Sequence, residues 1–534
     1  MNDVVAYESP HLPVGNLAAE ALQIARSGGG RVGIGFAKLR LDIERAWQTV
    51  MHLDCHEALV IAELIEHRAN ALSATVAKAL RGEIAALRAV AFVFQDDAAA
   101  ALPAALSARG PEASARTAHV ASTVCRSVYW RCGDLESFYA VDRVELDNRP
   151  GRMQAVSALF DLALDAAVAL DQMRFGAARL LAGHALDIGR RLVGTHVLAD
   201  AFPTCIIAQV LYEQGQVDDA EALLVARMVN IRECCTVESA LRAHGLLARI
   251  AASRGQHGRA LVMLSEAEAL GERRGWSRLR AASLAHQVEI EAGSGRIEQA
   301  ESCLQRLAEL ADEEHASSHV CFEIARFHTV ARARVALARS PCTVDLVALQ
   351  QIHRDMVWRG GLYAAVPVAL LLVEAWLAMG QRGEAIGGLV GLLRLAPSVG
   401  LHQTLVDCSV RVAELIEAIV QQQIVPASDT RELLPYASML LAHRQRDAGE
   451  SREPFATRRP NVGAGLSERE RLIVALMGRG LSNKQIAVEL GIAPETVKSH
   501  AKHLYSKLSV RNRTEAVTLA TRLGLLQLPR SPAV

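Results

Sequence analysis

The sequence is poor in aromatic residues: Phe, Trp and Tyr make up 4% of its 534 residues, although 51% of the residues are hydrophobic. A β-sandwich would need more aromatic and β-branched residues, whereas a chain rich in alanine and leucine packs helix against helix. We therefore predict an all-α protein. The chain is too long for one helical core, so we expect two or more domains.

Features typical of secreted and membrane proteins are also missing. The ten cysteines form no Cys-x-x-Cys pair, and the first residues lack the basic and apolar stretches of a signal peptide. The most apolar stretch, residues 362–379, is interrupted by Pro367 and Glu374, which makes it a poor transmembrane helix. We expect a cytoplasmic protein with reduced thiols and no contact with a membrane.

The sequence also lacks the short motifs of common catalytic sites. It contains no Gly-x4-Gly-Lys-Ser/Thr, no Gly-x-Ser-x-Gly and no His-Glu-x-x-His. The glycine-rich residues 27–35 lack the third glycine of a dinucleotide loop, so we interpret them as a connector. His52 and His56 have the spacing of half a zinc site, but no second Cys or His pair completes it. We expect neither an enzyme nor a resident cofactor or metal.

Lysine is rare and unevenly distributed. Only six of the 58 basic residues are lysines, and four of these six lie between residues 484 and 507. Residues 466–534 carry 11 Lys and Arg against 5 Asp and Glu, a net charge of +6; the whole chain is neutral, so the remainder is acidic. This segregation predicts that the C-terminal part binds a polyanion. The alternative is a solvated helical face without a partner.

A pattern of about forty residues repeats in the middle of the chain. Gly215, Gly255 and Gly295 are forty residues apart; alanine follows each glycine after five residues and leucine after nine, and the pattern returns at Gly380. Weaker copies lie near residues 96, 133, 172 and 340. We predict that each glycine ends one helix in the left-handed conformation and that the next helix packs its alanine closely against the first. Such hairpins must stack to bury their apolar faces, which gives a solenoid with a concave surface.

This pattern resembles the tetratricopeptide repeat, although that repeat is usually about 34 residues long and most of its Trp and Tyr positions are missing here. The resemblance implies a helical-repeat domain over residues 39–445. The N-terminal segment, residues 1–38, carries no clear signal of a fold. Residues 446–465 contain two prolines, three glycines and alternating charges; this composition predicts a flexible linker.

Signals for the start of four helices follow the linker. Two capping boxes, Ser467–Glu470 and Ser482–Gln485, are followed by Pro494 and by the cap Asn512–Glu515. A short basic helix that follows a glycine turn fits the major groove of DNA. The residues expected to read bases lie on one face of the third helix: Lys498, Ser499 and Lys502. The residues expected to contact phosphates lie near helix ends and turns: Asn483, Lys484, Thr496, Arg511 and Arg513.

This region is similar to the LuxR/FixJ-type helix-turn-helix family nearly from end to end. The matching stretches are Leu466–Glu470, Gly480–Ala487, Leu490–Ile492, Thr496–His500 and Tyr505–Leu508, with Arg513 and Glu515-Ala516. The resemblance implies a four-helix DNA-binding domain over residues 466–528, whose third helix enters the major groove and whose fourth helix pairs with a second copy. Ala493 replaces the Ser or Thr usual at this N-cap, which should cost about 1 kcal/mol of helix stability.

The repeats and this domain together resemble the C-terminal part of the MalT-type regulators, without the ATPase module of that family. The resemblance implies a bacterial, LuxR-type transcription regulator that binds double-stranded DNA as a homodimer on an inverted repeat, with RNA polymerase as a candidate partner. Its repeats would sense a small molecule, a peptide or a protein. The alternative is a scaffold or antagonist that pairs with another regulator through its repeats or its helix-turn-helix domain.

Overall fold

The computed structural model of the protein describes residues 31–72, 74–110, 113–144, 152–193, 197–233, 235–313, 318–421, 424, 427–450, 468–478, 481–490, 497–498, 501, 513 and 516. The chain divides into two compact units, Met1–Arg446 and Asp447–Val534. Every regular element in the described ranges is a helix, as the composition predicts.

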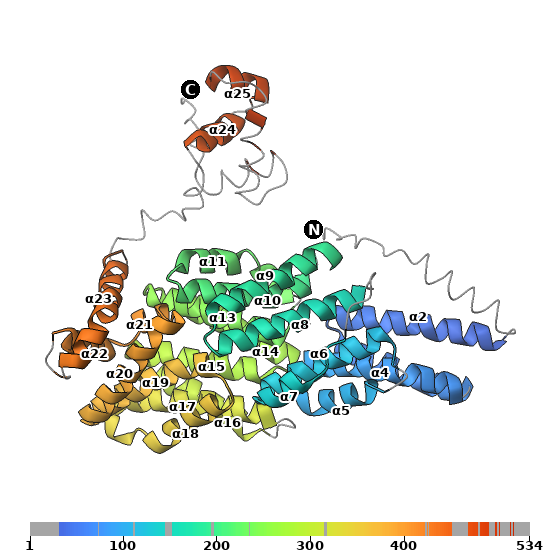
Figure 1. The fold of residues 1–534 in the computed structure, drawn as a ribbon, viewed down its shortest axis with the longest axis horizontal. Coiled ribbons are helices and arrows are strands. Elements are labelled where there is room, and N and C mark those ends of the chain that lie inside the picture. The colour runs from blue at the N-terminus through green and yellow to red at the C-terminus, as the bar shows by residue number, and fades with distance from the viewer. Residues whose placement is uncertain are drawn as a thin grey trace. The chain divides into compact units, whose positions relative to one another are not determined.

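The larger unit, which we call the repeat unit, is a succession of helical hairpins (Figure 1). Its first helices are α2 (Arg31–Met51), α3 (Cys55–Leu72), α4 (Ala74–Phe94), α5 (Ala98–Ala108), α6 (Ala115–Cys132), α7 (Leu135–Ala140), α8 (Arg152–Asp171) and α9 (Phe175–Ile188), with the π-helical turn η1 (Gly189–Val193). The middle helices are α10 (Val197–Glu213), α11 (Val217–Val225), α12 (Met228–Glu233), α13 (Val237–Ser253), α14 (His257–Arg274), α15 (Ser277–Gly293) and α16 (Ile297–Asp312). The last are α17 (Ser318–Arg339), the 3-10 turn η2 (Pro341–Thr343), α18 (Leu346–Trp358), α19 (Leu362–Ala378), α20 (Arg382–Val399), α21 (Gln403–Val406), α22 (Val410–Val420) and α23 (Ala427–Glu450).

The glycines of the forty-residue pattern lie at the hairpin turns, as predicted. Gly215, Gly255, Gly295 and Gly380 have φ of 74°, 72°, 75° and 77°, the left-handed region that glycine enters without a Cβ penalty. The alanines that follow them are fully buried between the paired helices, at Ala220, Ala260, Ala300 and Ala385. The repeat pattern therefore indicates both the position of the turn and the close approach of the two helices.

Three other hairpin turns place a larger residue in the same left-handed conformation. Leu53, Asp96 and Met173 have φ of 63°, 66° and 57°, which costs about 1–2 kcal/mol for an L-residue. The side chains of Leu53 and Met173 are buried in the core, and Asp96 belongs to a buried ionic network. The contacts of these side chains offset the backbone strain. Because the turn residue is not glycine, these turns give only weak copies of the repeat pattern or none.

The repeat unit curves back on itself, so hairpins far apart in sequence touch. The Nε1 group of Trp276 donates to the carbonyl of Phe94 at 2.9 Å, and the Nη1 group of Arg359 donates to the carbonyl of Cys132 at 2.9 Å. The hydroxyl of Tyr212 donates to a carboxylate oxygen of Asp407 at 2.6 Å. These three contacts join residues 182, 227 and 195 positions apart. One turn of the superhelix is thus held against the next.

The α8 helix carries the most membrane-like sequence in the described part of the chain. Its segment Met153–Asp171 is long and apolar enough to cross a bilayer, but 72% of that window is buried inside the fold. The neighbours that cover it are α6, α9 and α10. Such burial is expected of the core helix of a helical array. The stretch 362–379, considered above for the same reason, forms α19, which is also largely buried.

Helix α23 ends the repeat unit. It continues to Glu450 and therefore covers the first five residues of the predicted linker 446–465; the remainder of that linker lies outside the described residues. Helix α2 begins at Arg31, so residues 31–35 of the glycine-rich stretch are helical and their interpretation as a connector is wrong. The boundaries of the linker and of the N-terminal segment 1–38 stay predictions.

The smaller unit contains α24 (Glu468–Gly478) and α25 (Asn483–Leu490). Residues 497–498, 501, 513 and 516 are also helical. Its core contains Ile473, Val474, Leu476, Met477, Ile486, Ala487, Val497, Ala501 and Ala516. This core joins segments from all four predicted helices.

Candidate functional site

The turn between α24 and α25 is fixed by a reciprocal capping box, as the sequence predicts. The backbone N–H of Ser482 donates to Oε1 of Gln485 at 2.8 Å, and the hydroxyl of Ser482 donates to the same oxygen at 2.9 Å. The backbone N–H of Gln485 donates to Oγ of Ser482 at 3.4 Å. Two N–H groups at the helix start are thereby satisfied, and the orientation of α25 is fixed at its first turn.

Four of the eight predicted DNA-contacting residues lie in the described part of this unit. Lys484 on α25 and Lys498 are exposed, and Asn483 is half-buried at the start of α25. Lys498 directly follows the fully buried Val497, so its helix turns one side to the core and the adjacent side to solvent. Ser499 and Lys502, predicted to read bases with Lys498, and Thr496 and Arg511, predicted to contact phosphates, lie outside the described residues.

Arg513 has a contact that the sequence did not indicate. Its Nη2 group donates to the carbonyls of Met477 and Leu481, at 2.9 and 2.7 Å. These carbonyls lie at the C-terminal end of α24 and in the turn after it, where a helix leaves acceptors unsatisfied and favours a cation. Arg513 therefore joins the fourth helical segment to the turn that positions α25. The phosphate contact predicted for Arg513 stays a prediction.

The repeat unit holds a partly open cavity of about 630 Å³, which we call the central cavity. Its wall is built from the inner faces of α6, α13, α15, α17 and α19, together with the turns that close the superhelix. Charged and aromatic side chains alternate along this wall. A cavity of this size with convergent polar groups is typical of a site for a small organic ligand.

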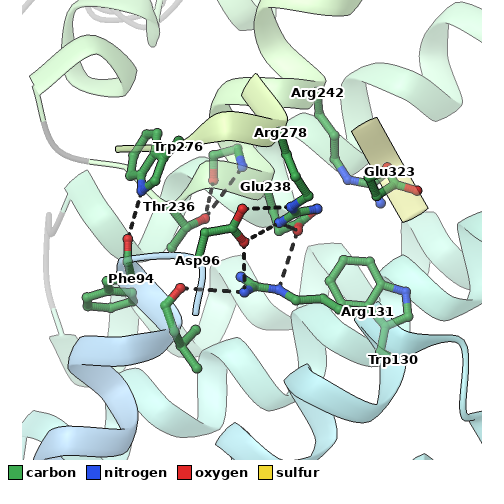
Figure 2. Close-up of polar contacts among 12 residues, drawn as sticks. Phe94, Asp96, Trp130, Arg131, Thr236, Glu238, Arg242, Trp276, Arg278 and Glu323 are labelled. Carbon is green, nitrogen blue, oxygen red and sulfur yellow. Dashed lines mark hydrogen bonds and ion pairs between the residues drawn. The ribbon is translucent and has the colours of Figure 1, made fainter. Parts of the chain in front are cut away.

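One end of the cavity is closed by a buried ionic network, shown in Figure 2. The guanidinium of Arg278 binds both carboxylate oxygens of Asp96, at 2.7 and 2.6 Å, and also Oε1 of Glu238 at 2.6 Å. Arg131 lies 3.3 Å from Asp96 and 3.4 Å from Glu238. All four side chains are at most 11% exposed. Two guanidinium and two carboxylate groups from four elements thus neutralise one another in the interior.

The network sets the protonation of Glu238. Burial alone would raise the pKa of Glu238, but the charges of Arg278 and Arg131 overcome this effect and hold that pKa at about 2. Glu238 is therefore ionised at neutral pH. The network joins the α4–α5 turn to α6, α13 and α15, so the first hairpins are tied to hairpins nearly two hundred residues later.

A second set of ion pairs lies on another wall. Arg334 on α17 donates to Glu374 at 3.1 Å and to Glu289 at 2.9 Å, and the charge of Arg334 is the main reason that the pKa of Glu289 is lowered despite burial. Arg242 on α13 donates to Gln209 at 2.6 Å and lies 3.5 Å from Asp171. These guanidinium groups already have partners within the protein.

Two residues that line the cavity have no such hydrogen-bond or ion-pair partner within the described structure. Arg249 on α13 places its guanidinium carbon 5.7 Å from the ring centroid of Tyr212, and among the described residues no acceptor bonds to it. His319 on α17 is 4% exposed, and neither of its ring nitrogens has a hydrogen-bond partner within the described structure. Neither residue was predicted from the sequence. For Arg249 the available signal was charged side chains at four- and seven-residue spacing along one helix, at Glu238, Arg242 and Arg249.

Of the two histidines with the spacing of half a zinc site, His52 has another contact. The Nδ1 atom of His52 lies 2.8 Å from the carbonyl of Gln48, and Cys55 between the two histidines is buried, which raises the pKa of its thiol to about 12. A thiol in this state is a poor metal ligand at neutral pH. The described residues contain no group of three or more potential metal ligands.

Comparison with known proteins gives a match for each unit. Residues 464–520 match the family of bacterial regulatory proteins called the luxR family, and residues 82–422 match the family called the MalT-like TPR region. The chain is also similar to the HTH-type transcriptional regulator MalT of Vibrio cholerae serotype O1, with 25% identity over 498 residues; the match covers 86% of this chain and 53% of the relative. The chain thus spans about half the length of this curated relative.

Proposed function

The chain belongs to the family of proteins with a MalT-like TPR region, and on that premise we propose that it is a transcription regulator whose repeat unit senses a ligand or partner and whose C-terminal unit reads a specific DNA sequence. Its C-terminal domain is of the DNA-binding LuxR type. The finer statements, on sequence reading and sensing, are our proposal.

One observation carries the DNA-reading part: the luxR-family match falls on the part of the chain that concentrates lysine. The exposed Lys498 lies next to Val497, which anchors its helix in the core. We assign base reading to Lys498, Ser499 and Lys502, and phosphate contacts to Asn483, Lys484, Thr496, Arg511 and Arg513. Arg513 has its two carbonyl contacts in addition to this role.

Sensing is assigned to the central cavity of the repeat unit. Its volume, its aromatic and charged wall, and the two ring nitrogens of His319 without a hydrogen-bond partner in the described structure support a ligand site there. Arg249, which also lines the cavity, contributes a guanidinium against the ring of Tyr212. Because the superhelix is closed by contacts between distant hairpins, a ligand that binds inside it would stabilise one curvature over others. This change of curvature is the signal that we propose reaches the C-terminal unit.

We further propose a homodimer on an inverted-repeat site, with RNA polymerase as a candidate partner, in the bacterial cytoplasm at the nucleoid. Binding of both half-sites by one dimer raises the effective concentration of the second DNA-binding unit. The curated relative is named as a transcriptional regulator, and that printed name supports the same role here.

The test is a gel shift of the full chain against fragments of the chromosome of its own organism, at 50 and 200 mM salt. Three basic residues per copy are proposed to contact phosphates, so a dimer that neutralises six phosphates should lose roughly a thousandfold in affinity between these salt concentrations. Retention of no fragment at either salt would contradict the proposal. Pairing with another LuxR-type regulator in its place would establish the scaffold alternative.

A further inference from the structure

The central cavity runs along one face of α13. Glu238, Arg242 and Arg249 all line it, and the twelve residues from the first to the last span about 16 Å of helix. Gly245, between Arg242 and Arg249, also lines the cavity and fills none of it with a side chain. The cavity therefore extends along α13 from the ionic network of Glu238, past Arg249, to Ser253.

The guanidinium of Arg249 is held against an aromatic ring instead of an acid. It is half-buried, and the ring centroid of Tyr212 lies 5.7 Å from its guanidinium carbon. Every other arginine that lines the cavity donates a hydrogen bond to a side chain or a carbonyl. Arg249 is thus the cavity arginine whose N–H donors have no acceptor among the described residues.

The carboxylates near Arg249 are occupied by other donors. Glu289 and Glu213 act on it through their charge, but Glu289 binds Arg334 at 2.9 Å. Glu213 accepts hydrogen bonds from the hydroxyls of Tyr363, at 2.7 Å, and Thr404. These acids lower the cost of burying the cation without satisfying its five N–H donors. The open side of Arg249 faces the cavity.

His319 supplies a second unsatisfied group, at the network end. Burial lowers the pKa of His319 well below its ordinary value, and Arg278 and Arg131 lower it further. The ring is therefore neutral at pH 7 and presents one N–H donor and one acceptor nitrogen. A buried imidazole with neither group bonded is costly unless a ligand or water satisfies it.

We propose that the central cavity binds an elongated organic anion, whose carboxylate or phosphate group is held by Arg249 and whose polar far end bonds to His319. The guanidinium offers a planar fork of donors that matches either anionic group, and its position against Tyr212 orients that fork. This inference names the ligand class of the sensor site and so rests on the proposed function.

The test measures thermal unfolding of the full chain in increasing inorganic phosphate, acetate or glycerol, with sodium chloride at matched ionic strength as the reference. Tryptophan fluorescence is the readout, because all five tryptophans lie in the repeat unit. Phosphate or acetate should raise the midpoint above the chloride reference, and glycerol, a neutral polyol, should act equally on every variant. Whichever anion acts more strongly identifies the head group.

Arg249→Gln should weaken the apparent affinity for the effective anion by about tenfold or more, and Arg249→Lys should keep part of it. Since Arg249 makes no hydrogen bond to the described protein, neither variant should unfold it. The matched control is Arg190→Gln, since Arg190 is 69% exposed and its ion-pair partner Asp187 is 52% exposed. His319→Phe should leave the midpoint shift by phosphate or acetate unchanged, because these probes do not reach the far end.

The proposal is overturned if neither anion exceeds the chloride reference, or if Arg249→Gln responds to the anions as the wild type does. DNA binding by the same preparations separates this failure from failure of the proposed function. If DNA fragments are retained but no anion effect is seen, the proposed regulator function stands and the proposed anion site is refuted. An anion effect that depends on Arg249, without retention of any DNA fragment, would support the anion site and contradict the proposed DNA binding.

Discussion

The two units of this chain use positive charge in opposite ways. In the repeat unit the basic residues are almost all arginines, and only Lys38 and Lys78 precede the C-terminal cluster. Many of these arginines are internal: Arg278, Arg131 and Arg334 each bridge two carboxylates within the fold. In the C-terminal unit the described lysines, Lys484 and Lys498, are exposed.

This difference follows from the chemistry of the two side chains. The guanidinium is planar, remains charged when buried and binds two acceptors at fixed angles, so it suits contacts that fix the curvature of a superhelix. The ammonium of lysine is a strongly hydrated point charge on a flexible stem, which suits contacts with the phosphates and base edges of a separate molecule. Arginine is used where charge holds the protein together, and lysine is added where we propose that charge meets DNA.

The largest expected effect is removal of Arg278 from the network. Arg278→Met leaves Asp96 and Glu238 with a single guanidinium and one uncompensated buried charge. The expected loss of unfolding free energy is about 3–5 kcal/mol. Urea unfolding followed by tryptophan fluorescence measures this loss in the repeat unit alone.

Arg190→Met provides the comparison for Arg278→Met. Arg190 and Asp187 are 69% and 52% exposed and lie 3.0 Å apart, so this variant should lose at most about 0.5 kcal/mol. Equal losses in the two variants would show that burial of the network contributes nothing, and the contrast between internal arginine and external lysine would fail.

The next effect is the response of the repeat unit to acid. The pKa of Glu238 is about 2 in the folded protein and near its ordinary value when unfolded, so the unfolded state takes up the proton first as the pH falls. Glu238 therefore contributes about 3 kcal/mol above pH 5, and this contribution is lost as the pH falls from about 4.5 to 2. Urea unfolding at pH 7, 4 and 3 measures it. Glu238→Gln should flatten this part of the profile; an unchanged slope would contradict the assignment.

Much of the fold was predictable because its signals are local. The glycine turns, the buried alanines and the capping box of Ser482 each involve residues within a few positions of one another. The pairing of Asp96 with Arg278 joins residues 182 apart, and no periodic pattern indicates which distant charges will meet. The cavity residues Arg249 and His319 were missed for the same reason.

Among the residues predicted to contact DNA, the exposed lysines could be predicted from the sequence, whereas a contact of Arg513 could not. The basic face was evident from the lysine cluster, and the structure places Lys484 and Lys498 at the surface. The contact of Arg513 with two carbonyls of the α24 turn was not predictable, because it depends on how the fourth helical segment packs. A basic residue in this family pattern can therefore act on the fold as well as on DNA.

On the DNA side, the larger effect is expected from Lys498. Lys498→Ala should cost about 1–3 kcal/mol on the preferred sequence and relax the preference for it, because a base-reading contact is lost. Fluorescence anisotropy with the preferred duplex and a scrambled duplex of equal length measures both terms. Equal losses on the two duplexes would refute the reading role of Lys498.

The smallest effect, expected from Lys484, sharpens the contrast within the C-terminal unit. Lys484 is exposed on the first turn of α25, next to the capping box, where a lysine can reach a phosphate without entering the groove. Lys484→Ala should weaken the preferred and scrambled duplexes by the same factor and reduce the slope of log affinity against log salt by about one for each copy bound. Because the ammonium contributes charge and not shape, Lys484→Arg should restore both the affinity and the slope. A loss confined to the preferred duplex would move Lys484 into the groove with Lys498 and require a different placement of α25 on DNA.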